Sequence, residues 1–376
     1  MSDTDRLAPL MERALALAER GGGGTAPNPM VGCVIADSGG RVLGEGFHRR
    51  AGGPHAEIEA LRAVAAAGHD PRGATVVVTL EPCAHQGRTP ACVDALVEAG
   101  IGRVAYATED PHIGKGGAGR LAAAGIPAIP GLLRREAELL AEPWLHFVRG
   151  GRPLFHLKSA LTLNGRVTRG ARGPRWITGP EARAAVHRLR RRHAAVVVGI
   201  GTALADDPLL TVRDWPPPGG PPADPSPLPW PDVQPLRVVL DPRLRLSLDS
   251  RLARTAGDAP VLVLCAEDGP RDRQASLGDR GVEVRRVGSG PTGLDLDAVA
   301  GVLADRGVTG ALVEPGPTLA RGLRAAGLVD RWTLFVAPVW EAAVDAVPFL
   351  DGLGLELRDP IWETHGPDAS VSGRLA

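Results

Sequence analysis

The sequence contains few aromatic side chains and no excess of either charge. Only 3% of its 376 residues are Phe, Trp or Tyr, and 43 basic residues balance 43 acidic ones. Lysine occurs only at positions 115 and 158, so arginine supplies almost all the positive charge. Proteins that bind single-stranded nucleic acid usually combine a basic groove with aromatic side chains that stack on bases. The composition therefore argues against a polynucleotide deaminase or an RNA-binding module, and we expect no nucleic-acid partner.

Long apolar runs and a leader are also missing. No apolar stretch approaches the ~20 residues that a membrane span requires, and the polar segment 1–6 does not have the layout of a signal peptide. Cysteine occurs only at positions 33, 83, 92 and 265. We therefore expect a protein of the reducing cytoplasm with no membrane partner.

The length and the 44% hydrophobic content are sufficient for two or three domains. Strand-like and helix-like segments alternate along the chain, which predicts an α/β fold. We place one domain at 1–149 and a second at 150–376, joined through a Gly-Gly-Arg-Pro linker. A Pro-rich segment at about 215–235 has no apolar period and is interpreted as a surface insertion.

The stretch from His55 to Cys92 predicts a catalytic zinc site. His55-Ala56-Glu57 is followed by Pro82-Cys83 and then by Cys92. One imidazole and two thiolates leave the fourth zinc position open for a water, which the metal makes more acidic. Glu57 is the expected proton carrier between that water and a leaving amine. This order of residues is the signature of zinc deaminases that act on nucleobase-like rings.

The local pattern places these residues at the ends of regular elements. We expect a helix over 57–67, a buried strand over 74–80 that ends before Cys83, and a helix over 90–99 with Cys92 in its first turn. A preceding helix over 5–20 and a hairpin of 31–36 and 41–47 complete a three-layer α/β domain. The alternatives are a structural zinc site, which would usually have four protein ligands, or three unrelated residues. One departure from the deaminase pattern is the spacing, because eight residues separate the two cysteines.

The zinc loop closely resembles that of the bifunctional riboflavin-biosynthesis deaminase/reductase family. The similar stretches are Thr79 to Cys92 and, upstream, Ala26 to Gly32, and further similarities extend the match over nearly the whole chain. The resemblance implies a cytidine-deaminase-like first domain and a dihydrofolate-reductase-like second domain that uses NADPH. It also places Asn28 against the pyrimidine, although the residue also suits a turn.

The second half shows strand-like segments and one helix start that suits a phosphate. We expect strands over 154–163, 194–198, 236–240, 261–265, 282–287, 310–314 and 332–337, and a helix over 180–192. A Gly/Pro turn after Glu314 leads to a helix that Thr318 opens, and free N–H groups at such a start suit a dinucleotide phosphate. This signal is weak alone, because many such units bind nothing.

Four stretches of this half resemble the family's reductase. They begin at Lys158, Trp176, Val198 and Val313. The resemblance implies substrate contacts at Arg190, Leu210, Arg213 and Glu314. It implies cofactor contacts at Trp176, Thr202, Asp206, Gly316, Pro317, Thr318, Leu319, Ala320, Arg321 and Gly322. Singly, these positions also fit an ordinary turn or a solvated helix face.

Several positions depart from the family pattern. Asn164 replaces an Asp, Pro174 and Pro242 replace serines, the loop after Pro338 lacks its usual glycines, and the loop that follows Asp110 and contains Lys115 is shortened. Two hypotheses follow.

In the first, the chain deaminates 2,5-diamino-6-ribosylamino-4(3H)-pyrimidinone 5′-phosphate with one Zn²⁺ and then reduces the ribosyl group with NADPH, as a homodimer formed through the reductase half. In the second, it is a deaminase-active paralogue of a specialised pathway, and its reductase half is impaired or altered.

Overall fold

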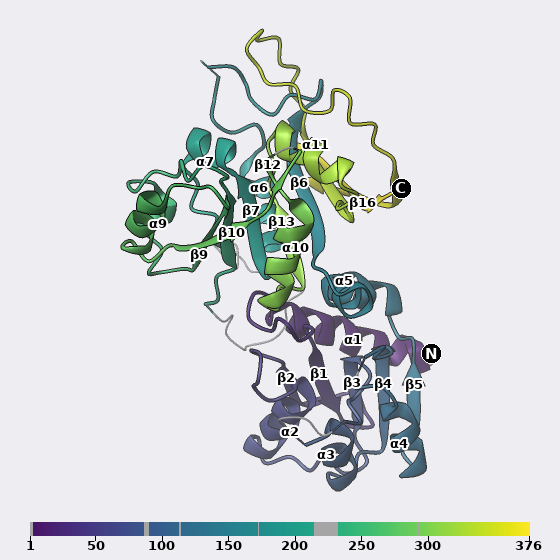
Figure 1. The fold of residues 1–376 in the computed structure, drawn as a ribbon. Helices are drawn as coiled ribbons and strands as arrows, with labels where there is room; N and C mark the ends of the chain where they lie inside the picture. Colours follow the sequence, from purple (N-terminus) through teal and green to yellow (C-terminus); the bar gives the residue numbers. More distant parts are fainter. Residues whose placement is uncertain (1–2, 86–89, 113, 172, 214–231, 292) are drawn as a thin grey trace. The chain divides into compact units, whose positions relative to one another are not determined.

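The computed structural model describes residues 3–85, 90–112, 114–171, 173–213, 232–291 and 293–376 (Figure 1). The chain divides into two compact units, with the boundary between Gly150 and Gly151. The predicted surface insertion at about 215–235 lies almost entirely outside the described residues. No helix among the described residues is long and apolar enough to cross a bilayer.

A five-stranded sheet in the order β2-β1-β3-β4-β5 forms the centre of the first unit. Antiparallel pairing of β1 and β2 confirms the predicted hairpin, and the central β3 runs parallel to β4. Every residue of β3 is buried, as its continuous apolar sequence predicts. The strands are β1 (Gly32–Ala36), β2 (Val42–Phe47), β3 (Thr75–Leu80), β4 (Arg103–Thr108) and β5 (Ala128–Pro130).

Helices cover both faces of this sheet and confirm the predicted three layers (Figure 1). Met11 and Leu17 of α1 pack against Val34 and Val77 on one face. On the other face, α2 and α3 pack against a second apolar cluster, and α2 contacts β1 and β2. The helices are α1 (Asp3–Glu19), α2 (Ala56–Ala66), α3 (Cys92–Glu98), α4 (Gly117–Ala123) and α5 (Arg134–Gly150).

The second unit contains a nine-stranded sheet in the order β10-β9-β8-β7-β13-β6-β14-β16-β15. The strands from β10 to β14 in this order are parallel, and β14, β16 and β15 pair antiparallel. All seven predicted strands are present, within two residues of the expected ends. The strands are β6 (Leu154–Thr162), β7 (Ala195–Gly199), β8 (Leu236–Leu240), β9 (Val261–Ala266), β10 (Glu283–Val287), β13 (Gly310–Val313), β14 (Arg331–Ala337), β15 (Leu357–His365) and β16 (Asp368–Leu375), with a small pair β11 (Ser289–Gly290) and β12 (Gly293–Leu294) beside them.

Helices cover both faces of this sheet as well. Helices α10 and α11 pack on one face, and α7, α8 and α9 pack on the other. Because β7 and β13 are parallel neighbours, α7 and α11, which follow them directly, begin at the same edge of the sheet. Helix α11 begins at Pro317 with Gly316 as its N-cap, so the prediction that Thr318 opens it was wrong by one residue. The helices are α6 (Pro180–Arg191), α7 (Ile200–Asp206), α8 (Arg251–Arg254), α9 (Arg271–Gly278), α10 (Leu296–Asp305) and α11 (Pro317–Ala325).

Candidate zinc site and reductase site

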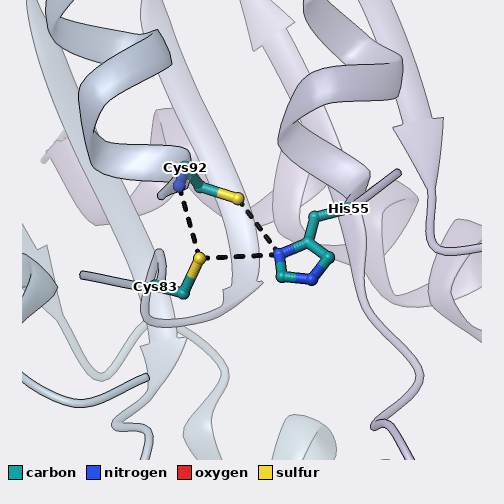
Figure 2. Close-up of side chains that lie close together, drawn as sticks. All are labelled: His55, Cys83 and Cys92. Atoms are coloured by element: carbon teal, nitrogen blue, oxygen red, sulfur yellow. Dashed lines mark hydrogen bonds between the residues drawn. The ribbon is translucent and has the colours of Figure 1, made fainter. Parts of the chain in front are cut away.

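Three side chains converge at one side of the first sheet. His55 is the N-cap of α2, Cys83 lies three residues after β3, and Cys92 is the first residue of α3. The three side chains point toward one another (Figure 2). His55 Nδ1 lies 3.2 Å from Cys92 Sγ and 3.5 Å from Cys83 Sγ, and the three donor atoms lie within 4.8 Å of one another.

This geometry fits a tetrahedral zinc ion. Zn–N bonds of about 2.0 Å and Zn–S bonds of about 2.3 Å, at tetrahedral angles, separate nitrogen and sulfur by about 3.5 Å. Of the two observed N–S distances, the one to Cys83 equals this value at 3.5 Å and the one to Cys92 is 0.3 Å shorter at 3.2 Å. Soft thiolate and imidazole donors are the ones that zinc prefers. Among the described residues, these three could hold the ion, and a fourth position is left for water or substrate.

Hydrogen bonding already favours a thiolate at this position. The Cys92 backbone N–H, at the start of α3, donates to Cys83 Sγ over 3.3 Å. Hydrogen bonds from Cys92 and His55 lower the pKa of Cys83 to about 4, against the opposing effect of burial. The hydrogen bond to Cys83, together with burial, raises the pKa of Cys92. These contacts favour the thiolate form of Cys83, and the backbone N–H at the start of α3 stabilises it.

Glu57 lies in the first turn of α2, two residues after His55, and its side chain is buried. Burial raises the pKa of Glu57, and the nearby His55 partly offsets that rise. A raised pKa makes the carboxylate a stronger base toward a nearby water. The structure thus places the predicted proton carrier beside the candidate metal ligands.

Asn28 is held by His48, a residue that the sequence interpretation missed. The Nδ1–H of His48 donates to the Pro54 carbonyl over 2.9 Å, and burial lowers the pKa of this histidine, so the ring is neutral. Its Nε2 is then an acceptor and lies 3.1 Å from Asn28 Nδ2. The amide is thereby oriented, with its oxygen free to accept a hydrogen bond from a ring N–H or an amino group.

The predicted substrate residues of the second unit form one connected cluster. Arg190 binds Glu314 through two hydrogen bonds of 2.6 and 3.1 Å and donates to the Thr211 carbonyl. Lys158 Nζ lies 4.0 Å from Glu314. Burial would raise the pKa of Glu314, but Arg190 and Lys158 outweigh it and lower the pKa to about 2. Arg213 is exposed and donates to the Thr211 hydroxyl, while Leu210 is buried with a left-handed φ of 56°.

The predicted cofactor residues meet where α7 and α11 begin. A Cβ atom at Gly316 would lie 3.5 Å from the Thr202 hydroxyl, and one at Gly199 would lie 3.7 Å from Leu319 Cδ2. The other predicted residues of this group, 317–322, form the first two turns of α11. Asp206 ends α7, and burial raises its pKa. Trp176 is 55% exposed, and the guanidinium groups of Arg175 and Arg183 lie 5.2 and 5.3 Å from the centroid of its ring.

One of the departures from the family pattern has a structural reason. Asn164 Nδ2 donates to the Glu341 carbonyl over 2.7 Å, and Asn164 Oδ1 accepts from the Glu341 N–H over 3.0 Å. An aspartate could accept the second hydrogen bond but could not donate the first. Asn164 therefore holds the altered loop after Pro338 as part of the fold.

Comparisons with known proteins agree with this division into two sites. Residues 5–108 match the cytidine and deoxycytidylate deaminase zinc-binding region, and residues 153–371 match the RibD C-terminal domain. The fold and the His/Cys/Cys site thus define a zinc-dependent deaminase domain joined to a dihydrofolate-reductase-like reductase domain.

Full-length relatives identify the particular family. The chain is 39% identical to riboflavin biosynthesis protein RibD of Escherichia coli, over 87% of this chain and 86% of that protein. It is 35% identical to RibD of Actinobacillus pleuropneumoniae, over 96% and 90% of the two chains. A Thermotoga maritima structure, described as a diaminohydroxyphosphoribosylaminopyrimidine deaminase/5-amino-6-(5-phosphoribosylamino)uracil reductase, is 31% identical and covers both chains fully with a TM-score of 0.80. The chain belongs to the RibD family of bifunctional riboflavin-biosynthesis enzymes.

Proposed function

We propose that this chain converts 2,5-diamino-6-ribosylamino-4(3H)-pyrimidinone 5′-phosphate in two steps. The first unit replaces the ring amine with a carbonyl oxygen from water and releases ammonia. The second unit then reduces the ribosyl side chain to ribityl with NADPH. The observation that carries the proposal is the convergence of His55, Cys83 and Cys92 beside the buried Glu57. The similarity to full-length RibD proteins does not favour the specialised-pathway alternative.

In the deaminase unit, His55, Cys83 and Cys92 would hold the zinc ion. When bound, zinc makes a coordinated water acidic enough to act as a nucleophile near neutral pH. Glu57 would accept the proton of that water and deliver it to the leaving amine. Asn28, oriented by His48, would accept a hydrogen bond from the pyrimidine. These residues would align the ring and transfer both protons of the water to nitrogen, one to the ring nitrogen beside the reacting carbon and one to the leaving amine, so that the oxygen remains as a carbonyl.

In the reductase unit, the start of α11 would bind a cofactor phosphate, since a helix start offers backbone N–H groups, and Thr202 of α7 would lie near the cofactor. NADPH, when bound, supplies the hydride. Arg190 and Arg213 would face the negatively charged substrate, and Glu314 holds the Arg190 guanidinium in a fixed direction. The protein's main task here is to align the nicotinamide with the sugar carbon.

We further propose a cytoplasmic homodimer formed through the second unit. All four cysteines are free thiols, which supports a reducing compartment. Strand β15 is the outermost strand of its sheet and is largely exposed, and such an edge can pair with another chain. Light scattering of the purified protein checks this state: a monomer at micromolar concentration contradicts it.

Mass spectrometry of the pyrimidine product tests the whole proposal. The zinc-loaded protein is incubated with the diaminopyrimidine substrate and NADPH. We expect the exchange of the amine for a carbonyl and the gain of two hydrogen atoms. Exchange alone would reject the reductase assignment, whereas an unchanged substrate would reject the proposed deaminase substrate.

A further inference from the structure

The two cysteine segments of the zinc site are separated by an unusually long spacer. Eight residues lie between Cys83 and Cys92, whereas a spacer of two residues would fix one sulfur closely relative to the other. The two segments contact each other directly, because the Cys92 N–H donates to Cys83 Sγ and the Val93 N–H donates to the Cys83 carbonyl, both over 3.3 Å, and other parts of the fold add to this link. The described residues point to α4 and the residues just before it, because they contact both segments.

The first cysteine segment is attached to this region through Glu81. The buried Glu81 carboxylate accepts hydrogen bonds from the backbone N–H groups of Ala118 (2.9 Å) and Asp110 (3.2 Å). One residue after the metal ligand, the Ala84 N–H donates to the Gly114 carbonyl over 3.0 Å. The residues on both sides of Cys83 are thus hydrogen-bonded to the backbone around the start of α4.

Close packing makes this attachment rigid. A Cβ atom at Gly117, the first residue of α4, would lie 1.8 Å from the Pro82 carbonyl oxygen, and one at Gly114 would lie 3.3 Å from Cys83 Cβ. Side chains at Gly117 are therefore impossible unless the backbone next to Cys83 moves. By contrast, a Cβ atom at Gly119, two residues further along α4, would meet nothing within 4 Å.

The second cysteine segment is attached through Arg120 of α4. Its guanidinium donates to the Ala84 carbonyl over 2.8 Å and also forms an ion pair with Asp94. Ala84 directly follows Cys83, and Asp94 lies in the first turn of α3, two residues after Cys92. One side chain therefore connects the segment of one sulfur ligand to the segment of the other.

We propose that Glu81 and Arg120 are positioning residues that hold the two cysteine segments in register and thereby set the zinc affinity of the site. The proposal rests on the proposed zinc-dependent deaminase function. Neither residue is among the three grouped ligands, and both would act on the ligands through the neighbouring backbone. Residues that orient metal ligands in this way commonly change metal affinity by about 10–100-fold when they are replaced.

The two residues should differ in the size of their effect. Glu81 is buried, so Glu81→Gln leaves one backbone N–H facing an amide NH₂ group, and we expect zinc affinity to fall about 10–100-fold. Arg120 and Asp94 are about half exposed, and exposed ion pairs contribute little. For Arg120→Gln we therefore expect a smaller loss of about 3–10-fold, mainly from the lost hydrogen bond to Ala84.

The experiment measures the zinc dissociation constant of the full-length chain by competition with a chromophoric chelator. The variants are E81Q, R120Q and Gly117→Ala. Arg134→Gln is the control for charge, because Arg134 pairs with Glu109 in the same unit at 3.7 Å and is not one of the contacts described above. Gly119→Ala is the control for a methyl group on the same helix. The thermal midpoint of each zinc-free variant, the deaminase rate at saturating zinc and the reductase rate are measured in parallel.

We expect E81Q, R120Q and G117A to weaken zinc binding in the order G117A, E81Q, R120Q, while R134Q and G119A bind zinc like the wild type. Unchanged zinc affinity in E81Q and G117A overturns the proposal. A loss of zinc affinity that is matched by an equal loss of zinc-free stability also overturns it, because the residues would then support the fold generally. If the wild type binds zinc at the three ligands without deaminating the substrate, the proposed function fails, and the zinc affinities still decide the positioning role.

Discussion

Replacing Glu57 with glutamine should separate metal binding from catalysis in the deaminase unit. The change keeps the size of the side chain but removes its ability to accept a proton. Because Glu57 is only 3% exposed, bulk water can hardly take over the proton transfer. General acid–base catalysis contributes about 10²–10⁴-fold to a rate, and the buried position favours the upper part of that range. We therefore expect deamination to slow about 10³–10⁴-fold, which corresponds to about 4–5.5 kcal/mol of barrier.

The assay follows ammonia release, and the reductase rate in the same chain provides an internal control. Zinc content, measured by mass spectrometry of the metal, should stay at one ion per chain, since Glu57 is not among the three grouped ligands. Deamination within tenfold of the wild-type rate, with zinc bound, would refute the role assigned to Glu57. Loss of zinc from the variant would show instead that the carboxylate supports the metal.

Three further predictions concern the ligands and the second unit. Cys83→Ser should weaken zinc binding and abolish deamination while the reductase rate stays within twofold, as chelator competition and the two activity assays can show. Glu314→Gln should leave the Arg190 guanidinium without its carboxylate partner and lower the free energy of unfolding at neutral pH by about 3 kcal/mol. The pKa of Glu314 in the folded state is about 2, so the wild type loses this stabilisation as Glu314 becomes protonated. The difference in stability between wild type and variant, measured by urea titration, should therefore shrink as the pH falls from about 4.5 toward 2. Burial lowers the pKa of His156 well below 6.5, so this ring stays neutral in the folded state while the unfolded state takes up a proton, and the free energy of unfolding of the wild type should fall as the pH drops below about 6.5. His156→Gln should make this dependence on pH less steep. An unchanged dependence would contradict the lowered pKa of His156.

Much of the zinc site could be predicted because its ligands lie at the ends of locally encoded elements. His55 precedes a helix, Cys83 follows an apolar strand, and Cys92 starts the next helix. The local sequence pattern therefore predicts the element end at which each ligand lies. His48 could not be found in this way, since its role depends on a contact with Asn28, twenty residues earlier in the chain.

The C-terminal hairpin was missed for a related reason. Strand β15 is mostly exposed and contains Pro360, so it shows neither the apolar run of a buried strand nor an uninterrupted alternation. Its pairing with β16, and that of β16 with β14, is a tertiary result that connects segments separated in the sequence. The attachment of the Cys83 segment to α4 and the residues before it likewise depends on the Ala118 N–H and the Gly114 carbonyl, which are backbone groups and therefore leave no sign in the residue types.

The pairing of Asn164 with the peptide of Glu341 has a consequence for swapping parts between relatives. The two hydrogen bonds connect positions 177 residues apart, and one partner is a main-chain group whose placement depends on the whole loop. Residue 164 and the loop after Pro338 must therefore match each other. Replacing Asn164 with aspartate leaves the Glu341 carbonyl without its donor, and replacing the loop removes the backbone groups that Asn164 binds. A chimaera should keep its activity only when both pieces come from the same parent.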